Sequence, residues 1–415
     1  GGASSEWSKR LEETSTELKK VVQRKGDSKA SCVVGGGCDP LPEMGLSVEF
    51  LRHFAEEHSA ATHCLSTHAV VERIVKPNTR SPWALYDPEP KGYSLAEMAH
   101  AQFKARSPHF FLSHAWRQTF SANKNQNAGG SGGGLVQAIL HSVPKDEYDS
   151  TFFWSDVFCL NHHQSLPPSS SSSSSSPDSN TQLHHHRKHE TSSSLPVIGA
   201  SFQHVRNAMI GCGHVKLFLE HWEDPAPLTR VWCLVEIITT LLLEKPLLVL
   251  MPPAAMRDLR EWALEDETRA LEAIGKHTCH HVSVSHAHAS RPSDRAAFLA
   301  QAEATIGLDA TTQFCQIMVK DALLEAAGLR EEESMVRTRQ WQDILNSLRE
   351  KASAAAIPQR LEIQRLVGSM QRRLSSPTTA DYTKGTEILR EAAELSRKFY
   401  GPKSQFHADI ARQIG

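Results

Sequence analysis

From residue 109 onwards, short apolar segments alternate with longer segments of helical pattern. The apolar segments have the length and the branched and aromatic side chains of buried strands, and they lie at 109–115, 151–160, 214–222, 246–252 and about 280–285. Helical patterns separate them, at 135–143, 197–213, 229–245 and roughly 254–274. Such alternation favours a parallel sheet with helices on both faces and right-handed crossovers. The sequence therefore predicts an α/β fold with a doubly wound, flavodoxin-like, five-stranded parallel sheet.

Two of these segments are apolar almost throughout. His109–Ala115 and Leu247–Leu250 have few polar positions, which is typical of strands covered on both faces. We predict that both are interior strands of one parallel sheet.

Two polar insertions interrupt the alternating unit. The first is the glycine-rich stretch 121–134, and the second is 161–196, which contains eight consecutive serines. Segments of this composition cannot bury a hydrophobic core. We expect both to be disordered surface loops. We assign the alternating unit, including both insertions, to residues 106–290.

The flanking regions have helical patterns. Residues 1–45 are expected to form a flexible N-terminal segment, and 46–105 a helical lead-in. Residues 291–377 form a predicted helical region, and 378–415 have the helix, Gly-Pro turn and helix of a tetratricopeptide (TPR)-like repeat that begins there. Because the chain lacks an initiator methionine and stops inside this repeat, we expect it to be a fragment.

Composition narrows the class of protein. The 415 residues carry a net charge of -2, so charge favours neither nucleic acid nor an anionic membrane as partner. No segment reaches the roughly 18 apolar residues of a membrane span. The eight cysteines are scattered and not clustered, as reduced thiols of a cytoplasmic protein are. We therefore expect a cytoplasmic protein without a membrane span.

Glu236 is the first candidate functional residue. It is the one charged residue in the segment VWCLVEIITTLLL, a helix that is apolar almost all round and hence buried. A buried carboxylate needs a partner or a raised pKa. The structural alternative to a functional role is an ion pair with Arg230 or Arg117. Trp232, four residues earlier, shares a helix face with Glu236.

The second candidate is the segment SHAWR, residues 113–117, at the carboxyl end of the first strand. Open α/β sheets bind ligands at this edge. His114 supplies a titratable ring, Trp116 a stacking surface and Arg117 a phosphate-binding fork. The structural alternatives are a Trp116 that packs under the flexible loop and a solvated Arg117. Asp156, late in the second strand, belongs to the same edge unless it only caps a turn.

Two weaker patterns do not indicate a metal site or a phosphate-binding site. The histidines of 277–288 and of the sequence HHHRKH lack the paired Cys/His spacing of a zinc site, so we predict no metal. The GGSGGG run is not followed by GK[ST] and is not a phosphate-binding P-loop.

The segments FLSHAWR, FWSDVFCLN and LTRVWCLVEI together resemble the Toll/interleukin-receptor (TIR) domain. They are most similar to TIR-like proteins of algae, oomycetes and fungi that are often described as kinesin light chain or TPR proteins. The resemblance extends over roughly residues 44–325, with MGLSVEFLRHF and VVERIVKP as its lead-in. It implies the TIR type of sheet and a place in signal transduction. SHAW and the two insertions depart from the plant and animal pattern, which puts substrate binding in doubt more than fold.

Catalytic TIR domains hydrolyse NAD through the glutamate that corresponds to Glu236. The resemblance thus implies a signalling NAD glycohydrolase with NAD as substrate and no cofactor. It places Ser113, His114, Trp116, Arg117, Asp156 and Trp232 in the substrate site. The alternative is a catalytically inactive scaffold that binds protein partners by TIR-like self-association and through its helical repeats. Because the Glu236 helix follows the third strand, we predict its carboxylate in a cleft shared with residues 113–117.

Overall fold

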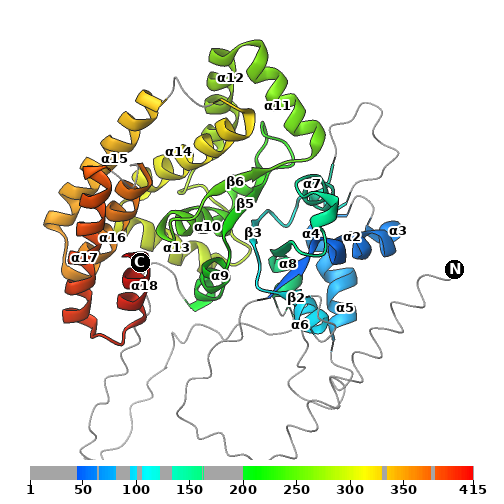
Figure 1. Cartoon of the computed structure of the whole chain (residues 1–415), viewed down its shortest axis with the longest axis horizontal. Helices are drawn as coiled ribbons and strands as arrows, with labels where there is room; N and C mark the ends of the chain where they lie inside the picture. The colour runs from blue at the N-terminus through cyan, green and yellow to red at the C-terminus, as the bar shows by residue number, and fades with distance from the viewer. Residues whose placement is uncertain are drawn as a thin grey trace, which may run out of the picture.

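The computed structural model describes residues 44–62, 65–80, 94–100, 105–121, 133–160, 162, 200–329, 334–374 and 379–414. The expected N-terminal segment therefore lies outside the described residues apart from its last two positions, and so do nearly all of both insertions. An α/β unit occupies one side and the centre of the molecule, and a layer of long helices occupies the other side (Figure 1).

The sheet has six strands in the order β2-β1-β4-β3-β5-β6. Their bounds are β1 Gly45–Ser47, β2 Ala105–Arg106, β3 Phe110–Ser113, β4 Phe152–Trp154, β5 His214–Phe218 and β6 Leu247–Leu250. The run β4-β3-β5-β6 is parallel, whereas β1 is antiparallel to both β4 and β2. The α/β class is confirmed, but the prediction of a five-stranded, all-parallel sheet is wrong. β3 is interior as predicted, whereas β6 lies at the edge.

The predicted fifth strand near residues 280–285 is replaced by helical turns and a loop. A π-helical turn at Ile274–Thr278 leads into a 3-10 turn at Cys279–His281. Val282 and Val284 are buried, so their alternation with polar residues reflects loop packing and not strand pairing. β6, the last strand of the sheet, contacts a helix, α14 (Leu308–Ala327).

The lead-in supplies the other sheet edge. Besides β1 and β2 it forms α2 Val48–Glu57, α3 Ser59–Thr62, α4 Thr67–Val70, a π-helical turn Val71–Val75, α5 Lys76–Thr79 and α6 Leu95–His100. Ser47 caps α2 as a polar residue before an apolar helix should, because its side chain accepts from the Phe50 amide at 3.1 Å. The boundary expected between residues 105 and 106 runs through β2. The lead-in is thus part of the sheet and not a separate segment.

Helices cover both faces of the sheet (Figure 1). They are α7 Leu135–His141, α8 Asp156–Cys159, α9 Ala200–Gly211, α10 Val231–Leu242, α11 Pro253–Glu265 and α12 Glu267–Ala273, with 3-10 turns at Lys145–Glu147 and Ala226–Thr229. Phe111 packs in the core with α9 and α10, whereas its neighbour Leu112 packs in the core with α2 and α7. This alternation along β3 is the reason why the strand is apolar on both faces.

The C-terminal layer consists of α13 Pro292–Thr305, α14, α15 Ser334–Ala354, α16 Ile357–Leu374, α17 Ala380–Tyr400 and α18 Gln405–Ile414. α14 ends at Gly328, whose φ of 84° suits a glycine cap. α17, the Gly-Pro turn and α18 have the helix-turn-helix shape that the sequence indicates. None of the described helices is both long enough and apolar enough to span a bilayer.

A buried charged cluster joins this layer to the α/β unit. Arg206 of α9 pairs with Asp409 of α18 at 2.6 Å, and both side chains are 1% exposed. The Gln413 amide of α18 donates to the Leu242 carbonyl, one of the last carbonyls of α10. The side-chain oxygen of Gln413 accepts a hydrogen bond from Arg365 Nε at 2.7 Å. The C-terminal helices are therefore anchored to α9 and α10 by polar contacts as well as by apolar packing.

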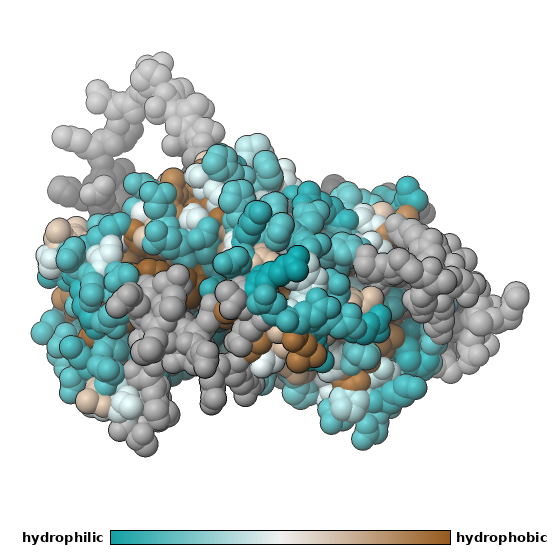
Figure 2. All heavy atoms as spheres, turned by 90° about the horizontal axis from the view of Figure 1, so that it is seen from above, coloured by the Kyte–Doolittle hydropathy of each residue, from teal (hydrophilic) through white to brown (hydrophobic). Residues whose placement is uncertain are grey.

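The surface seen from the side of α11 and α12 is mostly hydrophilic, with apolar residues in small patches (Figure 2). Leu264, near the end of α11, is the most exposed large apolar residue described, at 86%. A single exposed leucine is ordinary in a folded protein.

Candidate functional site

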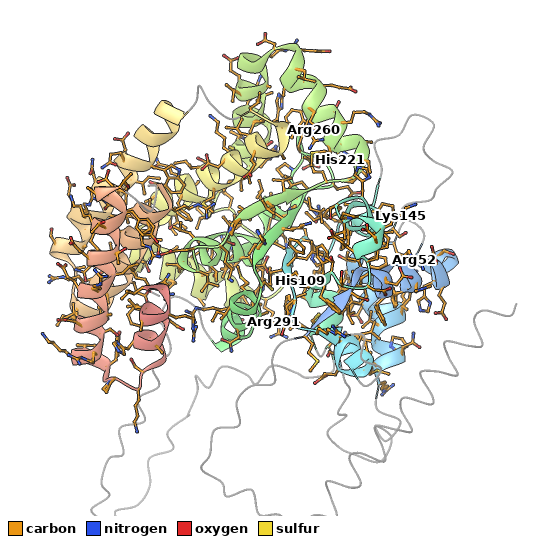
Figure 3. The ribbon with its side chains drawn as sticks, in the orientation of Figure 1. Arg52, His109, Lys145, His221, Arg260 and Arg291 are labelled. Atoms are coloured by element: carbon orange, nitrogen blue, oxygen red, sulfur yellow. The ribbon has the colours of Figure 1, made fainter. Side chains whose placement is uncertain are left out.

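The ends of β3 and β4 meet the beginning of α10 at the carboxyl edge of the parallel strands. His221 follows β5 and marks this edge, whereas His109 precedes β3 and marks the opposite one (Figure 3). The Cys233 thiol, in the first turn of α10, donates to the His114 carbonyl at 3.4 Å. This contact places the start of α10 directly against the SHAWR segment.

The connection before α10 determines where this helix begins. The 3-10 turn Ala226–Thr229 contains Pro227, and α10 starts two residues after it. The Val231 amide, which has no partner within its own helix, donates to the His288 carbonyl at 2.9 Å. The loop that follows the region of the expected fifth strand thus provides a hydrogen-bond acceptor for one amide in the first turn of α10.

Glu236 lies in the second turn of α10 and is 9% exposed. Burial raises the pKa of its carboxyl well above the usual range, the nearby Ser113 hydroxyl opposes this shift, and the Asp156 carboxylate adds to it. Burial therefore favours the neutral form of this carboxyl. The structure places Glu236 beside Ser113, on the same edge as the SHAWR segment, but in a buried position and not in an open cleft.

Asp156 links two residues of the SHAWR segment. Its Oδ2 accepts a short hydrogen bond from the Trp116 indole N–H, and its Oδ1 lies 3.5 Å from His114 Nε2. Asp156 is the first residue of α8 and directly follows Ser155 at the end of β4. The Asp156 carboxylate therefore orients the rings of both His114 and Trp116.

Five buried polar atoms of these residues and of Ser155, the chain neighbour of Asp156, form no well-aligned hydrogen bond with any described residue. They are Ser113 Oγ, His114 Nε2, Ser155 Oγ, Asp156 Oδ1 and Glu236 Oε2. Buried polar atoms are normally satisfied by protein groups or ordered water. A group of five donors and acceptors at a ligand-binding edge is therefore suited to a small polar ligand.

Two histidine rings contact the Trp116 ring. His68 of α4 stacks on its ring at a centroid distance of 5.5 Å and an interplanar angle of 27°, and His162 meets it edge-on at 5.7 Å. The His68 amide also donates to the Trp116 carbonyl at 2.9 Å. The lead-in therefore covers this side of the site, and one face of Trp116 is already occupied.

The other expected site residues lie nearer the surface. Arg117 is exposed, in agreement with the structural alternative of a solvated side chain, and Trp232 is half-buried against the core. Neither Arg117 nor Arg230 forms an ion pair with Glu236 within the described residues, so the ion-pair alternative for Glu236 finds no support there.

Sequence reasoning missed Ser155, Cys233, His68 and His162. Cys233 has a detectable signal, because it lies three residues before Glu236 and therefore on the same helix face. His68 lies 48 positions before Trp116, and nothing local connects the two. The described residues contain no group of three or more potential metal ligands close together.

Comparisons with known proteins give no family. The sequence matches no protein-family model, and neither the curated proteins nor the solved structures include a similar one.

Proposed function

We propose that this chain is a TIR-like signalling protein of the cytoplasm that hydrolyses NAD, with Glu236 as the catalytic carboxylate. The observation that carries the proposal is that Glu236 lies beside Ser113 and near the Asp156 carboxylate at the carboxyl edge of β3 and β4, among buried polar atoms without a well-aligned hydrogen bond. The mixed sheet differs from the TIR arrangement expected from the sequence, so the proposal rests on the site and on the motifs around it, and not on the fold.

The chemistry requires one carboxylate. When the bond between ribose C1′ and the nicotinamide nitrogen breaks, the electron pair leaves with nicotinamide and positive charge develops on the ribose. A carboxylate beside the ribose stabilises this charge. Water then adds to C1′ and loses a proton. Nicotinamide is a neutral leaving group, so no second acid is needed.

Burial prepares Glu236 for a cationic substrate. Burial raises the pKa of this carboxyl well above the usual range and so favours its protonated form. A positively charged nicotinamide ring nearby favours the ionised form, so the substrate itself generates the carboxylate that the reaction needs. Ser113, whose hydroxyl already lowers the pKa of Glu236, supports the same form.

The test is nicotinamide release from NAD by the purified chain and by Glu236→Gln. Glu362→Gln is the matched control, because Glu362 is also a buried glutamate with a raised pKa but lies far along the chain, in α16. We expect Glu236→Gln to lose at least about 100-fold in turnover, the scale of lost electrostatic stabilisation, and Glu362→Gln to retain activity. Equal turnover in Glu236→Gln and the parent would exclude Glu236 as the catalytic residue.

A specific observation favours a second candidate, the non-catalytic scaffold. His68 and His162 occupy Trp116, and Glu236 is almost fully buried, so the site is covered on the side of the lead-in. A scaffold would release no nicotinamide but would self-associate, which mass measurement by light scattering over a range of concentrations detects.

A further inference from the structure

The Trp116 ring is held in one orientation by hydrogen bonds on both its side chain and its backbone. The indole N–H donates to Asp156 Oδ2, and the Trp116 carbonyl accepts from the His68 amide at 2.9 Å. Beside this contact, the Thr67 amide donates to the Gln118 carbonyl at 3.0 Å. The Trp116 side chain is half-buried. A flat ligand that packs on a ring already fixed in this way loses little binding energy to ordering the protein.

The two histidines that contact Trp116 differ in how they are held. The His162 Nε2 lies 3.0 Å from the Val157 carbonyl, which ties this ring in place. His68 is exposed, and its ring forms no hydrogen bond with any described residue, although it stacks on Trp116 at an interplanar angle of 27°. The hydrogen bond to Trp116 comes from the His68 backbone, so the ring can rotate into solvent while α4 stays in place. Such rotations of exposed side chains are fast, and the His68 ring therefore covers the face of Trp116 reversibly.

The charge at the edge of the Trp116 ring favours a cation on its face. Tryptophan attracts cations more strongly than the other aromatic side chains do, and a carboxylate that accepts from the indole N–H polarises the ring further in this sense. The Asp156 side chain is 25% exposed, and no lysine or arginine of the described residues pairs with it. A planar cation on Trp116 is therefore attracted by the ring and by Asp156, whereas a neutral ring gains only the packing.

We propose that Trp116 is a stacking site for a planar aromatic cation, and that the His68 ring occupies this site until the cation displaces it. A pyridinium ring has the required shape and charge. The inference rests on the proposed function only for the natural ligand, which is then the nicotinamide ring of NAD. Because one aromatic ring replaces another, His68 lowers the affinity of the site without closing it.

Binding of a small pyridinium tests the site without any turnover. The probe is 1-methylnicotinamide, titrated into the full chain with isotope-labelled tryptophan and followed by NMR, and nicotinamide is its neutral counterpart. The eight tryptophans give separate indole N–H signals, and the Trp116 signal is the one missing from Trp116→Phe. We expect the cation to shift this signal with a Kd about twofold to fivefold lower than that of nicotinamide, the scale of a cation–π contact at an exposed site. Equal Kd values, or an unmoved Trp116 signal, would overturn the proposal.

Variants of two exposed histidines test the displacement. His68→Ala uncovers Trp116 and should lower the Kd of 1-methylnicotinamide about twofold to tenfold, the scale of one aromatic pair. His53→Ala is the matched control, because His53 is also an exposed histidine of the lead-in but pairs with Glu49 on α2, and it should leave the Kd unchanged. A His68→Ala variant that binds no more tightly than the parent would show that His68 does not compete for the site.

A second pair of variants tests the charge. Asp156→Asn keeps an oxygen that accepts from the indole but removes the charge, and should reduce the preference for the cation over nicotinamide. Glu72→Gln is the control, because Glu72 also lies near His68 but is paired with Lys76 at 2.5 Å, and it should leave the preference unchanged. A preference that Asp156→Asn leaves intact would contradict the assignment of Asp156 to this site.

The outcomes also separate the stacking site from the proposed activity. A shift of the Trp116 signal in a chain that releases no nicotinamide from NAD would support the stacking site and exclude the hydrolase. Hydrolysis of NAD with a KM that His68→Ala does not lower would exclude displacement of His68 by the substrate.

Discussion

Two buried polar clusters of this molecule differ in how their charges are compensated. The seam cluster, between α9, α16 and α18, consists of Arg206, Glu362, Arg365 and Asp409, which are two guanidinium groups and two carboxyl groups. The edge cluster, at the ends of β3 and β4, consists of Ser113, His114, Ser155, Asp156 and Glu236. The Asp156 carboxylate adds to the raised pKa of Glu236, and no guanidinium of the described residues pairs with either carboxyl group.

The difference distinguishes buried polar groups that stabilise the fold from buried polar groups that are suited to bind a ligand. In the seam cluster, charges of opposite sign face one another, and the Arg206–Asp409 ion pair at 2.6 Å offsets part of the cost of desolvation. In the edge cluster the cost stays uncompensated in the folded chain, which is characteristic of sites that a ligand completes. Substitutions should therefore have opposite signs in the two clusters: loss of stability in the first and little loss, or gain, in the second.

The largest effect should come from Asp409→Ala. This change leaves Arg206 buried without its 2.6 Å partner, and we expect a loss of about 3–5 kcal/mol in the free energy of unfolding, measured by urea denaturation. The double variant Arg206→Met, Asp409→Leu removes both charges and should recover most of the loss. A double variant as unstable as Asp409→Ala would show that packing, and not charge pairing, determines the stability of this seam.

Close packing between α16 and α17 is the second contribution to the stability of the C-terminal layer. A Cβ atom on Gly385 of α17 would lie 2.9 Å from the Gly368 carbonyl of α16, and these backbone atoms cannot move aside cheaply. Gly385→Ala should cost about 1–3 kcal/mol, measured by the same denaturation. Gly275→Ala is the control, because nothing lies within 4 Å of its Cβ position, and it should be neutral or slightly stabilising. A neutral Gly385→Ala would mean that α16 and α17 separate easily.

Glu236→Gln tests the edge cluster through pH. The folded-state pKa of Glu236 is raised, so the folded chain holds this proton more tightly than the unfolded chain. Its contribution to stability is full below the unfolded pKa near 4.5 and is lost as pH rises towards the folded value. Glutamine does not titrate. The variant should match the parent near pH 4 and become more stable by at least about 1 kcal/mol at neutral pH, followed by thermal unfolding. An advantage that shrinks as pH rises would reveal a hidden cationic partner.

Ser113→Ala should have the smallest effect. The hydroxyl is buried and has no well-aligned bond, so its removal should change stability by less than about 1 kcal/mol near pH 4. It also removes the group that lowers the pKa of Glu236. The pH-dependent loss of stability should therefore extend to higher pH than in the parent, whereas combination with Glu236→Gln should abolish that extension. A Ser113→Ala curve parallel to the parent's would show that the two side chains do not interact.

The parts of the fold that were predictable have strong local patterns. The segments of β3, β4 and β6 are almost entirely apolar, and β5 has apolar residues on either side of Lys216. The caps Ser47 and Gly328 follow from backbone chemistry at helix ends. β1 and β2 escaped detection because strands of three and two residues show no periodicity. The false strand near 280–285 arose because Val282 and Val284 alternate with polar residues in a loop.

The sequence by itself determined that Glu236 is buried, because the helix around it is apolar on every side, and that it lies near the SHAWR segment, because both follow parallel strands. Only the tertiary structure decided that His68 covers Trp116, that Asp156 joins Trp116 to His114, and that the C-terminal helices meet α9 and α10 through paired charges. The physical reason is the sequence distance over which each effect acts. Periodicity and capping depend on neighbours within a few residues, whereas the partner of a buried polar group is determined by which distant elements pack together.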